Sequence, residues 1–191
     1  MSIAVKRDRI YTYADYLSWN DGESWELIDG VAYNMSPAPN RRHQEVSRNL
    51  LIKFGNYVEG KPCQVYSAPF DVRLPLRDEK EEDIINVVQP DILVVCDKSK
   101  LDDKGCIGAP DLVVEIFSAS TSKKDHNEKF NLYEKVGVEQ YWIAYPYEKE
   151  IYIYQLIDGK YDNGTKYSVG QSIEPEKFAG LSISLEDVFR E

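Results

Sequence analysis

Two apolar segments of the chain each carry a carboxylate. The first spans residues 87–95 and contains Asp91, and the second spans 110–117 and contains Glu115. An ionised carboxylate among Val, Leu and Ile costs several kcal/mol, roughly, unless a partner compensates its charge. If the segments form an antiparallel hairpin about residue 103, position i faces position 206 − i, and Asp91 then faces Glu115. Facing carboxylates repel each other unless a cation lies between them. The pattern therefore predicts a divalent metal, and oxygen ligands favour Mg²⁺ or Mn²⁺ over zinc.

Both segments have the pattern of central strands. In a strand, residues two apart share a face, so Asp91 shares one with Leu93, and Glu115 shares one with Phe117. The residues of the opposite face are also apolar: Ile92, Val94, Val114 and Ile116. Strands that are apolar on both faces are covered on both sides. We therefore expect the carboxylates at the base of a cleft, or where a helix covers the sheet.

A helix expected over 121–136 carries the matching positive charge. Its inward stripe, with spacings of three, four and seven residues, is Lys129, Leu132, Tyr133 and Val136. A lysine on this apolar side can neutralise the carboxylates, orient a water, or stabilise negative charge that develops on a phosphate. Asp125, one turn earlier, can hold Lys129 by an i, i+4 pair. The alternative is a lysine stem that passes Tyr133 and keeps its charge in solvent.

The other expected elements surround these three. We expect a helix over 12–19, a hairpin over 25–35 that turns at Asp29-Gly30, a long helix after Asn40, a strand over 64–74 bent at Pro69, a solvated loop over 77–83, strands over 139–145 and 150–156, and a helix over 184–189. The Asp-Gly pair is a strong hairpin signal, and Thr12 with Asp15 forms a capping box. Paired strands before and after helices indicate an α/β fold with a central mixed β-sheet flanked by helices.

Size and charge limit the possible functions. The 191 residues, 42% hydrophobic and 29% charged, indicate one globular domain over 1–191. The net charge of −10 argues against non-specific binding to nucleic acid, which depends on neutralisation of phosphates by Lys and Arg. The charge does not exclude a nuclease, because metal ions and a local basic patch can offset a repulsive field.

The chain shows no targeting signal. Residues 1–8 lack the apolar core of a secretory signal, and no apolar run approaches the ~20 residues of a membrane span. Cys63, Cys96 and Cys106 share no close metal-ligand spacing, although Cys96 and Cys106 could flank one turn. We expect free thiols in a reducing cytosol, and hence a cytoplasmic protein with no membrane partner.

Several short motifs follow one another along the chain. They are Glu26-Leu27-Ile28-Asp29-Gly30, Ser36-Pro37 with His43, Gln89-Pro90-Asp91, Pro110 to Ile116, Ser118 to Thr121, Asp125 with Lys129 and Tyr133, Gly137-Val138, and Tyr141-Trp142-Ile143. In this order they resemble the PD-(D/E)XK nuclease superfamily, which has the restriction-endonuclease-like fold. Within it they resemble the Uma-type branch of small bacterial endonucleases. The motifs cover most of the chain.

The resemblance implies a metal-dependent phosphodiesterase with a restriction-endonuclease-like core. Asp91 and Glu115 would hold one or two divalent ions, which polarise the phosphate and lower the pKa of the attacking water. The superfamily's lysine normally lies two residues after the acid, where this chain has Phe117. Resemblance to the Uma-type branch implies that Lys129 takes its place, which is also the lysine that the inward stripe indicates.

Two further residues enter through the resemblance. It implies that Glu26 approaches the metal site as an added carboxylate, and His43 as an acid/base or a phosphate contact. From the residues alone, Glu26 could be an exposed strand residue and His43 a first-turn helix residue. We expect His126 to be solvated. We expect no catalytic role for Asp111, because Pro110-Asp111 opens a strand, a normal place for proline.

Three functions fit these observations. The favoured one is a Mg²⁺- or Mn²⁺-dependent endonuclease acting on DNA, with a basic rim of Arg41, Arg42, Lys123 and Lys124. The second is an interaction module without turnover, whose dimer or partner surface would be Tyr145, Tyr147, Tyr152 and Tyr154. The third is a metal-free acid/base hydrolase, which would leave Lys129 without a purpose. Because cutting both DNA strands needs two active sites, we also expect a homodimer.

Overall fold

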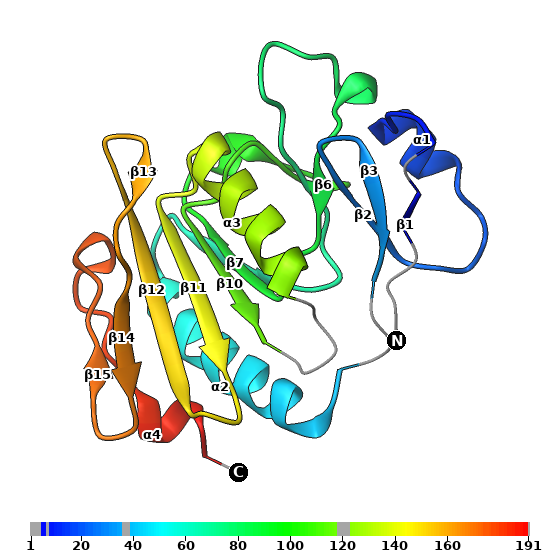
Figure 1. The fold of residues 1–191 in the computed structure, drawn as a ribbon. Helices are drawn as coiled ribbons and strands as arrows, with labels where there is room; N and C mark the ends of the chain where they lie inside the picture. Colours follow the sequence, from blue (N-terminus) through cyan, green and yellow to red (C-terminus); the bar gives the residue numbers. More distant parts are fainter. Residues whose placement is uncertain (1–4, 7, 36–38, 118–122, 191) are drawn as a thin grey trace.

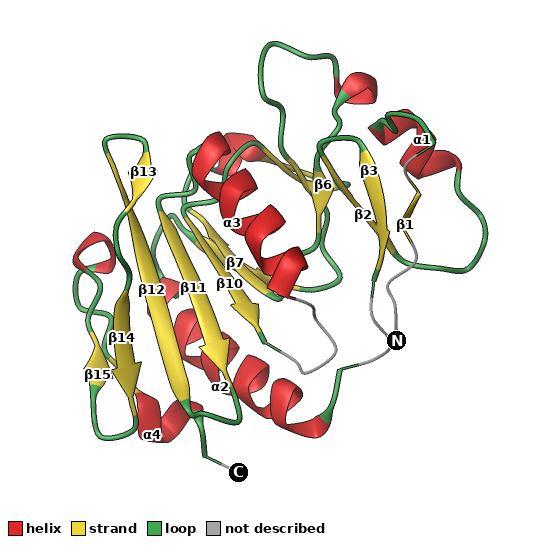
Figure 2. Cartoon of the chain, in the orientation of Figure 1, coloured by secondary structure: helices red, strands yellow, loops and turns green. Residues whose placement is uncertain are grey.

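In the part of the chain that the structure describes, the fold is built on two large sheets with α-helices packed against them (Figure 1). The structure is a computed structural model that describes residues 5–6, 8–35, 39–117 and 123–190; the side chains of 5, 6 and 123–126 are outside this description. Figure 2 shows how the strands divide between the two sheets. Mixed sheets with helices packed on them confirm the expected α/β class.

The central sheet carries the second predicted segment as β10 and only residues 92–95 of the first, as β7. The expectation of one strand over 87–95 is wrong, because residues 87–88 form β6 of the second sheet. Its strand order is β13-β12-β11-β10-β7-β4, with β14 also paired to β12. The strands are β4 (Gln64–Ser67), β7 (Ile92–Val95), β10 (Leu112–Ile116), β11 (Gln140–Tyr145), β12 (Glu150–Ile157), β13 (Lys160–Tyr161) and β14 (Thr165–Ser168). β10 and β11 are parallel, and the other pairs are antiparallel. The carboxylate strands β7 and β10 are adjacent and have neighbours on both sides, as their two apolar faces predicted.

The register between β7 and β10 is the predicted one. Leu112 pairs with Val94, Val113 with Leu93, and Val114 with Ile92, so the numbers of each pair add to 206. Asp91 immediately precedes β7, and one further step along this register brings it opposite Glu115. The alternation of apolar residues therefore predicted the register of β7 and β10 correctly.

The second sheet contains the predicted hairpin. Its order is β1-β3-β2-β6-β5-β9-β8. The strands are β1 (Val5–Lys6), β2 (Trp25–Ile28), β3 (Val31–Asn34), β5 (Val72–Arg73), β6 (Val87–Val88), β8 (Leu101–Asp102) and β9 (Gly105–Ile107). β2 and β3 turn at Asp29 (φ 48°) and Gly30 (φ 72°), the left-handed pair of a tight hairpin turn. A small ribbon pairs β15 (Ser172–Ile173) with β16 (Ile183–Ser184).

Two long helices cover opposite faces of the central sheet. α2 (Arg41–Val58) buries Val46, Leu50 and Phe54 against one face, as its stripe predicted. α3 (Lys123–Val136) packs Leu132 and Tyr133 on the other. α3 lies in front of β10 and β11 in Figure 1. The short helices are α1 (Tyr13–Ser18), with the predicted Thr12/Asp15 capping box, and α4 (Leu185–Val188).

The expected single strand over 64–74 is wrong. The structure has β4 in the central sheet and β5 in the second sheet, separated by the cis Ala68–Pro69 peptide and residues up to Asp71. Proline cannot donate to a strand ladder, so the strand ends there and the chain crosses to the other sheet. The crossing matters for function because residues of both sheets meet at the candidate site.

The expectation of three free thiols is also wrong. Cys63 and Cys96 form a disulfide, and only Cys106 is free and buried. In the β4–β7 ladder Gln64 pairs with Val95, so the preceding and following residues, Cys63 and Cys96, face each other. Spacing along the chain could not show this, because the pair is created by strand register.

Among the described residues, no helix combines the length and the apolar character that crossing a membrane requires.

Gly105→Ala should destabilise the fold by about 2–5 kcal/mol. Gly105 has φ 128°, and an added Cβ would lie 2.2 Å from the backbone oxygen of Asp71. Urea denaturation measures the change. Gly55→Ala is the control, because Gly55 lies in α2 with nothing within 4 Å of its added Cβ and should gain slightly in stability. Equal stability of the two variants would contradict the prediction.

Candidate active site

Glu115 lies on the α3 side of the central sheet, and Asp91 lies at the end of β7, where it contacts His43 of α2. Asp91 follows the crossover from β6 into β7, and its Oδ2 accepts a hydrogen bond from the Ile116 backbone N–H at 2.7 Å. This bond ties the Asp91 carboxylate to the residue directly after Glu115. The two acids thus lie on neighbouring central strands, with side chains 21% and 13% exposed.

Lys129 joins two acids from different sheets. Its Nζ lies 3.0 Å from Oε1 of Glu115 in β10 and 2.8 Å from Oε1 of Glu26 in β2. The Lys129 side chain is only 13% exposed, which excludes the alternative of a charge in solvent. The Tyr133 hydroxyl, one turn further along α3, donates to the same Glu115 oxygen at 2.8 Å. The inward stripe of α3 therefore delivers an ammonium and a phenol to Glu115.

Burial and the charges of this cluster shift the pKa values of its side chains. Burial raises the pKa of Glu115 to about 7; the negative charges of Asp91 and Glu26 add to the rise, and Lys129 opposes it. Burial alone would lower the pKa of Lys129, but Glu115 and Glu26 outweigh burial, so its pKa is raised and the ammonium stays charged. Burial and the Glu115 charge raise the pKa of Tyr133, which stays a neutral donor. The acids thus outnumber the one ammonium that pairs with them.

His43 contacts the other acid. It lies in the first turn of α2, where its backbone N–H bonds to the Asn40 side chain, and it is buried, with 7% exposed. Its Nε2 lies 3.2 Å from Asp91 Oδ1. Among the described residues Nδ1 has no hydrogen-bond partner. His43 is thus a first-turn helix residue, as the residues alone suggested, and it is also a neighbour of Asp91.

Glu26 is buried and not an exposed strand residue. It is 7% exposed, and its Oε1 accepts the Gln89 backbone N–H at 2.8 Å in addition to Lys129. The five predicted site residues therefore form two groups: Asp91 with His43, and Lys129 with Glu115 and Glu26. The bond from the Ile116 N–H to Asp91 connects the groups through the backbone of β10.

Asp111 lies outside this cluster. Its carboxylate accepts the Cys96 backbone N–H at 2.8 Å and pairs with Lys177 at 2.8 Å, while Lys177 also contacts Glu139. These contacts tie strand ends and the C-terminal segment together. The predicted Asp125–Lys129 pair and the solvated His126 fall on side chains outside the described residues, and the acids that hold Lys129 are Glu26 and Glu115.

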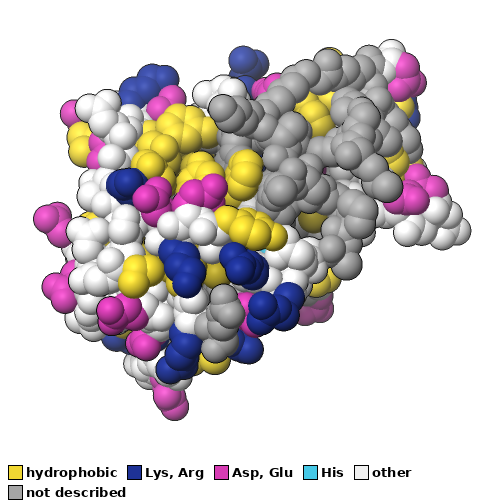
Figure 3. All heavy atoms as spheres, turned by 60° about the horizontal axis from the view of Figure 1, so that its bottom comes forward, with side chains coloured by type: hydrophobic (Ala, Val, Ile, Leu, Met, Phe, Trp, Pro, Cys, Tyr) yellow, Lys and Arg dark blue, Asp and Glu magenta, His cyan; other side chains and the backbone are white. Residues whose placement is uncertain are grey.

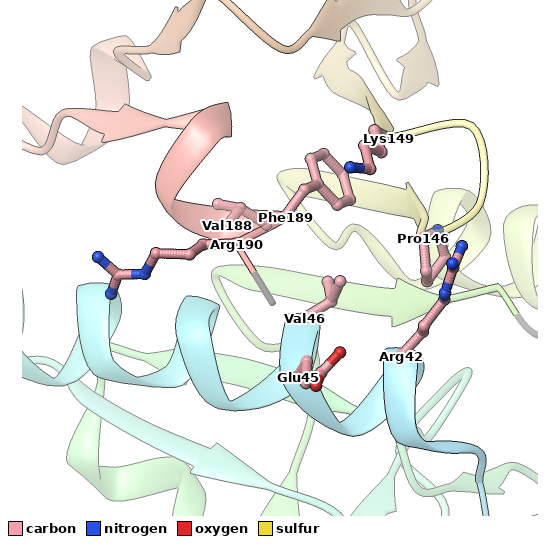
Figure 4. Close-up of a pocket in the computed structure, with 8 residues that line it drawn as sticks. All are labelled: Arg42, Glu45, Val46, Pro146, Lys149, Val188, Phe189 and Arg190. Carbon is pink, nitrogen blue, oxygen red and sulfur yellow. The ribbon is translucent and has the colours of Figure 1, made fainter.

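The predicted basic rim is described only in part. Arg41 pairs with Glu45 at 2.7 Å, and the guanidinium of Arg42 lies 5.0 Å from the centre of the Tyr147 ring. The side chains of Lys123 and Lys124 are outside the described residues. A pocket beside the start of α2 is lined by Arg42, Glu45, Val46, Pro146, Lys149, Val188, Phe189 and Arg190. In this pocket Arg42 points toward Pro146, whereas Arg190 points away (Figure 4). None of the five predicted site residues lines it.

The tyrosine surface expected for an interaction module is mostly absent. Tyr147 is 54% exposed, but Tyr145, Tyr152 and Tyr154 are half-buried. The Tyr145 and Tyr152 rings lie 5.6 Å apart edge to face, and Tyr154 packs on Phe130 at 5.0 Å. These rings pack on the same side of the central sheet as α3.

The acids fit a hard divalent cation. Mg²⁺ commonly takes one or two protein carboxylates and completes its coordination with water and phosphate oxygens. Asp91 and Glu115 provide such a pair, and the negative charges of Asp91 and Glu26 add to the rise that burial causes in the pKa of Glu115. Within the described part of the chain, no three His, Cys, Asp or Glu side chains form a ready ligand cluster. The remaining ligands would therefore come from water and substrate.

The prediction from sequence missed three residues that support the cluster. Tyr16 and Asp71 carried no signal, because they are 55 positions apart and meet only in the fold. Gln89 belongs to the Gln-Pro-Asp motif, but nothing in the sequence shows that its backbone N–H reaches Glu26. Tyr133 was placed on the inward stripe without its bond to Glu115.

The fold and the arrangement of the acids define a restriction-endonuclease-like protein. A search of solved structures finds a crystal structure of a "putative nuclease belonging to DUF820" from Anabaena variabilis ATCC 29413. It is similar with a TM-score of 0.74 and 18% sequence identity, over 93% of this chain and 97% of that one. At this identity the match shows the fold alone.

The family follows from the sequence match. Residues 13–186 match the Uma2 family model, described as "Putative restriction endonuclease". The chain therefore belongs to the Uma2 family, which confirms the resemblance. No curated protein sequence matches it.

As pH rises from 5 to 8, the free energy of unfolding of Glu115→Gln should increase relative to that of the wild type. Between its ordinary value near 4.3 and the folded pKa of about 7, the folded state binds more protons than the unfolded state. Ionisation of Glu115 therefore costs stability as pH rises through this window, and glutamine removes the cost. We expect a relative gain of about 1–3 kcal/mol, from urea unfolding in EDTA.

The control for this experiment is Glu134→Gln on the same helix as Lys129. Lys160 lowers the pKa of Glu134, so this variant should show no gain toward pH 8. A Glu115→Gln difference that is the same at both pH values would contradict the raised pKa.

Proposed function

We propose that this protein is a Mg²⁺- or Mn²⁺-dependent endonuclease that hydrolyses DNA phosphodiester bonds, with residues 1–191 forming one restriction-endonuclease-like domain. One observation carries the proposal. The Lys129 ammonium is held against Glu115, while the Asp91 carboxylate, just before the neighbouring strand β7, accepts the N–H of the residue after Glu115. Two carboxylates for a metal and one fixed cation are the groups that phosphodiester hydrolysis needs. Membership of the Uma2 family supports the same reaction.

Asp91 and Glu115 would hold the metal. When bound, the metal would polarise the phosphate and lower the pKa of the attacking water. The hydrogen bond from Ile116 N–H orients one oxygen of Asp91 and leaves the carboxylate on the side of Glu115. Because Glu115 has a pKa of about 7, it is readily deprotonated when a cation binds.

Lys129 acts through its charge and not as a base. Its raised pKa keeps it protonated at neutral pH, so it can stabilise the charge that develops on the phosphate or orient the attacking water. Glu26 and Glu115 hold the ammonium from two sides, and Tyr133 holds Glu115. A fixed cation costs little reorganisation as the transition state forms.

His43 acts on Asp91. With Nε2 facing Asp91 Oδ1 and the ring buried, it is placed to orient that carboxylate. This role differs from the direct acid/base role that the resemblance implied. The phosphate contacts would come from other groups.

Those contacts would lie at the end of the sheet where α2 begins. Arg41, Arg42, Lys149 and Arg190 lie there, and Figure 3 shows Lys and Arg side chains close together on the corresponding face. Such a local group can attract a phosphate backbone although the whole chain has a net charge of −10. Because the rest of the chain is acidic, we expect a few specific contacts with DNA and not a broad basic surface.

The assembly and location of the protein stay predictions. A two-fold homodimer would place two active sites on one duplex. A cytoplasmic location follows from a DNA substrate, and the Cys63–Cys96 disulfide is the observation against it, since such bonds are rare in reducing compartments.

Mn²⁺ should bind the wild type saturably and should not bind Asp91→Asn. The variant keeps the size of the side chain but removes one of the two carboxylate charges. Isothermal titration calorimetry measures this without knowledge of the DNA substrate. The matched control is Asp111→Asn, at the second Pro-Asp pair, which should bind Mn²⁺ like the wild type. Absence of binding in the wild type would refute the metal site and favour an interaction module.

We expect Lys129→Met to bind Mn²⁺ at pH 8 but to cleave DNA more slowly than the wild type, by on the order of 100-fold or more. Methionine matches the length of lysine and removes its charge. Cleavage of supercoiled plasmid in Mn²⁺ measures the rate. Lys135→Met, on the same helix, removes only an exposed pair with Asp29 and should leave the rate unchanged. Wild-type cleavage by Lys129→Met would exclude the catalytic role of this lysine.

A further inference from the structure

Gln89 lies at the junction between the two sheets. β6 ends at Val88 and β7 begins at Ile92, so Gln89 belongs to neither strand. It precedes Pro90, which restricts it to an extended backbone conformation but leaves the orientation of its peptide open to adjustment. A residue here needs contacts other than a strand ladder to hold its backbone N–H in one direction.

The side chain of Gln89 supplies these contacts. Its Nε2 donates to Asp71 Oδ1 at 2.7 Å and to the Tyr16 hydroxyl at 3.1 Å. The Tyr16 hydroxyl also donates to Asp71 Oδ1, at 3.0 Å. These three half-buried residues come from α1, the start of β5 and the junction. They form a closed triangle of hydrogen bonds.

Asp71 is itself fixed by the second sheet. Its backbone oxygen accepts the Cys106 N–H at 2.9 Å, and Gly105 allows this approach because it has no Cβ. β5 and β6 pair Val72 with Val88, so the same register places Asp71 opposite Gln89. The triangle is therefore attached to the sheet and does not depend on a surface loop.

The backbone N–H of Gln89 points to the site. It donates to Glu26 Oε1 at 2.8 Å, and this oxygen also lies 2.8 Å from Lys129 Nζ. Glu26 thus has one oxygen shared between a backbone donor and the ammonium. If the Gln89 peptide turned, Glu26 would lose the donor that fixes its carboxylate beside Lys129.

We propose that Gln89, held by Asp71 and Tyr16, is a positioning residue that aims its backbone N–H at Glu26 and so fixes the Lys129 ammonium against Glu115. The effect of Gln89 on catalysis rests on the proposed endonuclease function. The effect of Gln89 on the mobility of Lys129 is independent of that function. Gln89 contacts neither Lys129 nor Glu115 itself and acts only through Glu26.

The first experiment compares Gln89→Ala with Gln155→Ala. Gln155 accepts a side-chain bond from Gln140 at 2.8 Å and donates one to the Glu139 carbonyl oxygen at 3.2 Å, so both variants lose amide hydrogen bonds, but Gln155 is remote from Lys129. In Mn²⁺-dependent DNA cleavage we expect kcat of Gln89→Ala to fall on the order of 10- to 100-fold with KM for DNA unchanged. Gln155→Ala should lose thermal stability and keep its kcat. Wild-type kcat in Gln89→Ala would overturn the catalytic part of the proposal.

A conservative variant separates positioning from folding. Asp71→Asn keeps an oxygen that can accept from both Gln89 and Tyr16, whereas Asp71→Ala removes it. We expect Asp71→Asn to retain kcat and Asp71→Ala to lose it to the same extent as Gln89→Ala. Equal loss in both Asp71 variants would overturn the hydrogen-bonded triangle as the cause.

The second experiment needs no activity. In ¹⁵N-labelled protein, hydrogen exchange at the Lys129 ammonium is followed by NMR, with Lys129→Met identifying the signal. We expect exchange to be at least about tenfold faster in Gln89→Ala and unchanged in Gln155→Ala. Unchanged exchange in Gln89→Ala would overturn the proposal. If the wild type cleaves no DNA but its ammonium loosens in Gln89→Ala, the endonuclease function fails and the positioning of Lys129 stands.

Discussion

The buried ammonium of Lys129 is the interaction on which this end of the molecule depends. It joins α3 to Glu115 in the central sheet and to Glu26 in the second sheet. A lysine buried without partners would lose its proton. Glu115 and Glu26 outweigh the effect of burial and raise the pKa of Lys129, so the ammonium stays charged. The two ion pairs hold the two sheets and the helix in one relative position where Asp91 enters the central sheet.

The cluster is poorly balanced for stability alone. Glu115 has a pKa raised to about 7 even beside Lys129, because burial disfavours its charge and the negative charges of Asp91 and Glu26 add to the rise. A cluster selected only for stability would replace one of these acids with a neutral or apolar residue. Acids kept close together at a cost in folding free energy are typical of sites that bind a cation during function. The imbalance thus supports the metal site independently of any family resemblance.

The sequence predicted the parts of the fold that follow from local periodicity. Apolar residues on both faces predicted the central strands β7 and β10, and symmetry about residue 103 predicted their register. The same pattern did not show that residues 87–88 leave this sheet and form β6 of the second one. The helical stripe predicted an inward Lys129. Contacts that depend on which sheet a strand joins were not predictable. The split of 64–74, the Cys63–Cys96 bond and the meeting of Tyr16, Asp71 and Gln89 all arise from chain crossings between the sheets. No local pattern records these crossings.

The acidic chain and the proposed DNA substrate are compatible for a physical reason. A protein with a net charge of −10 repels a nucleic acid at long range, so it gains little from non-specific electrostatic attraction. At the site, however, a divalent ion bound by Asp91 and Glu115 would join the Lys129 ammonium and neutralise the excess negative charge of the acids. The repulsive field would then weaken binding at most surfaces, while the local repulsion of phosphate at this one point would be removed. An acidic nuclease would in this way depend on its metal both for chemistry and for holding the phosphate, so metal and DNA would each strengthen the binding of the other.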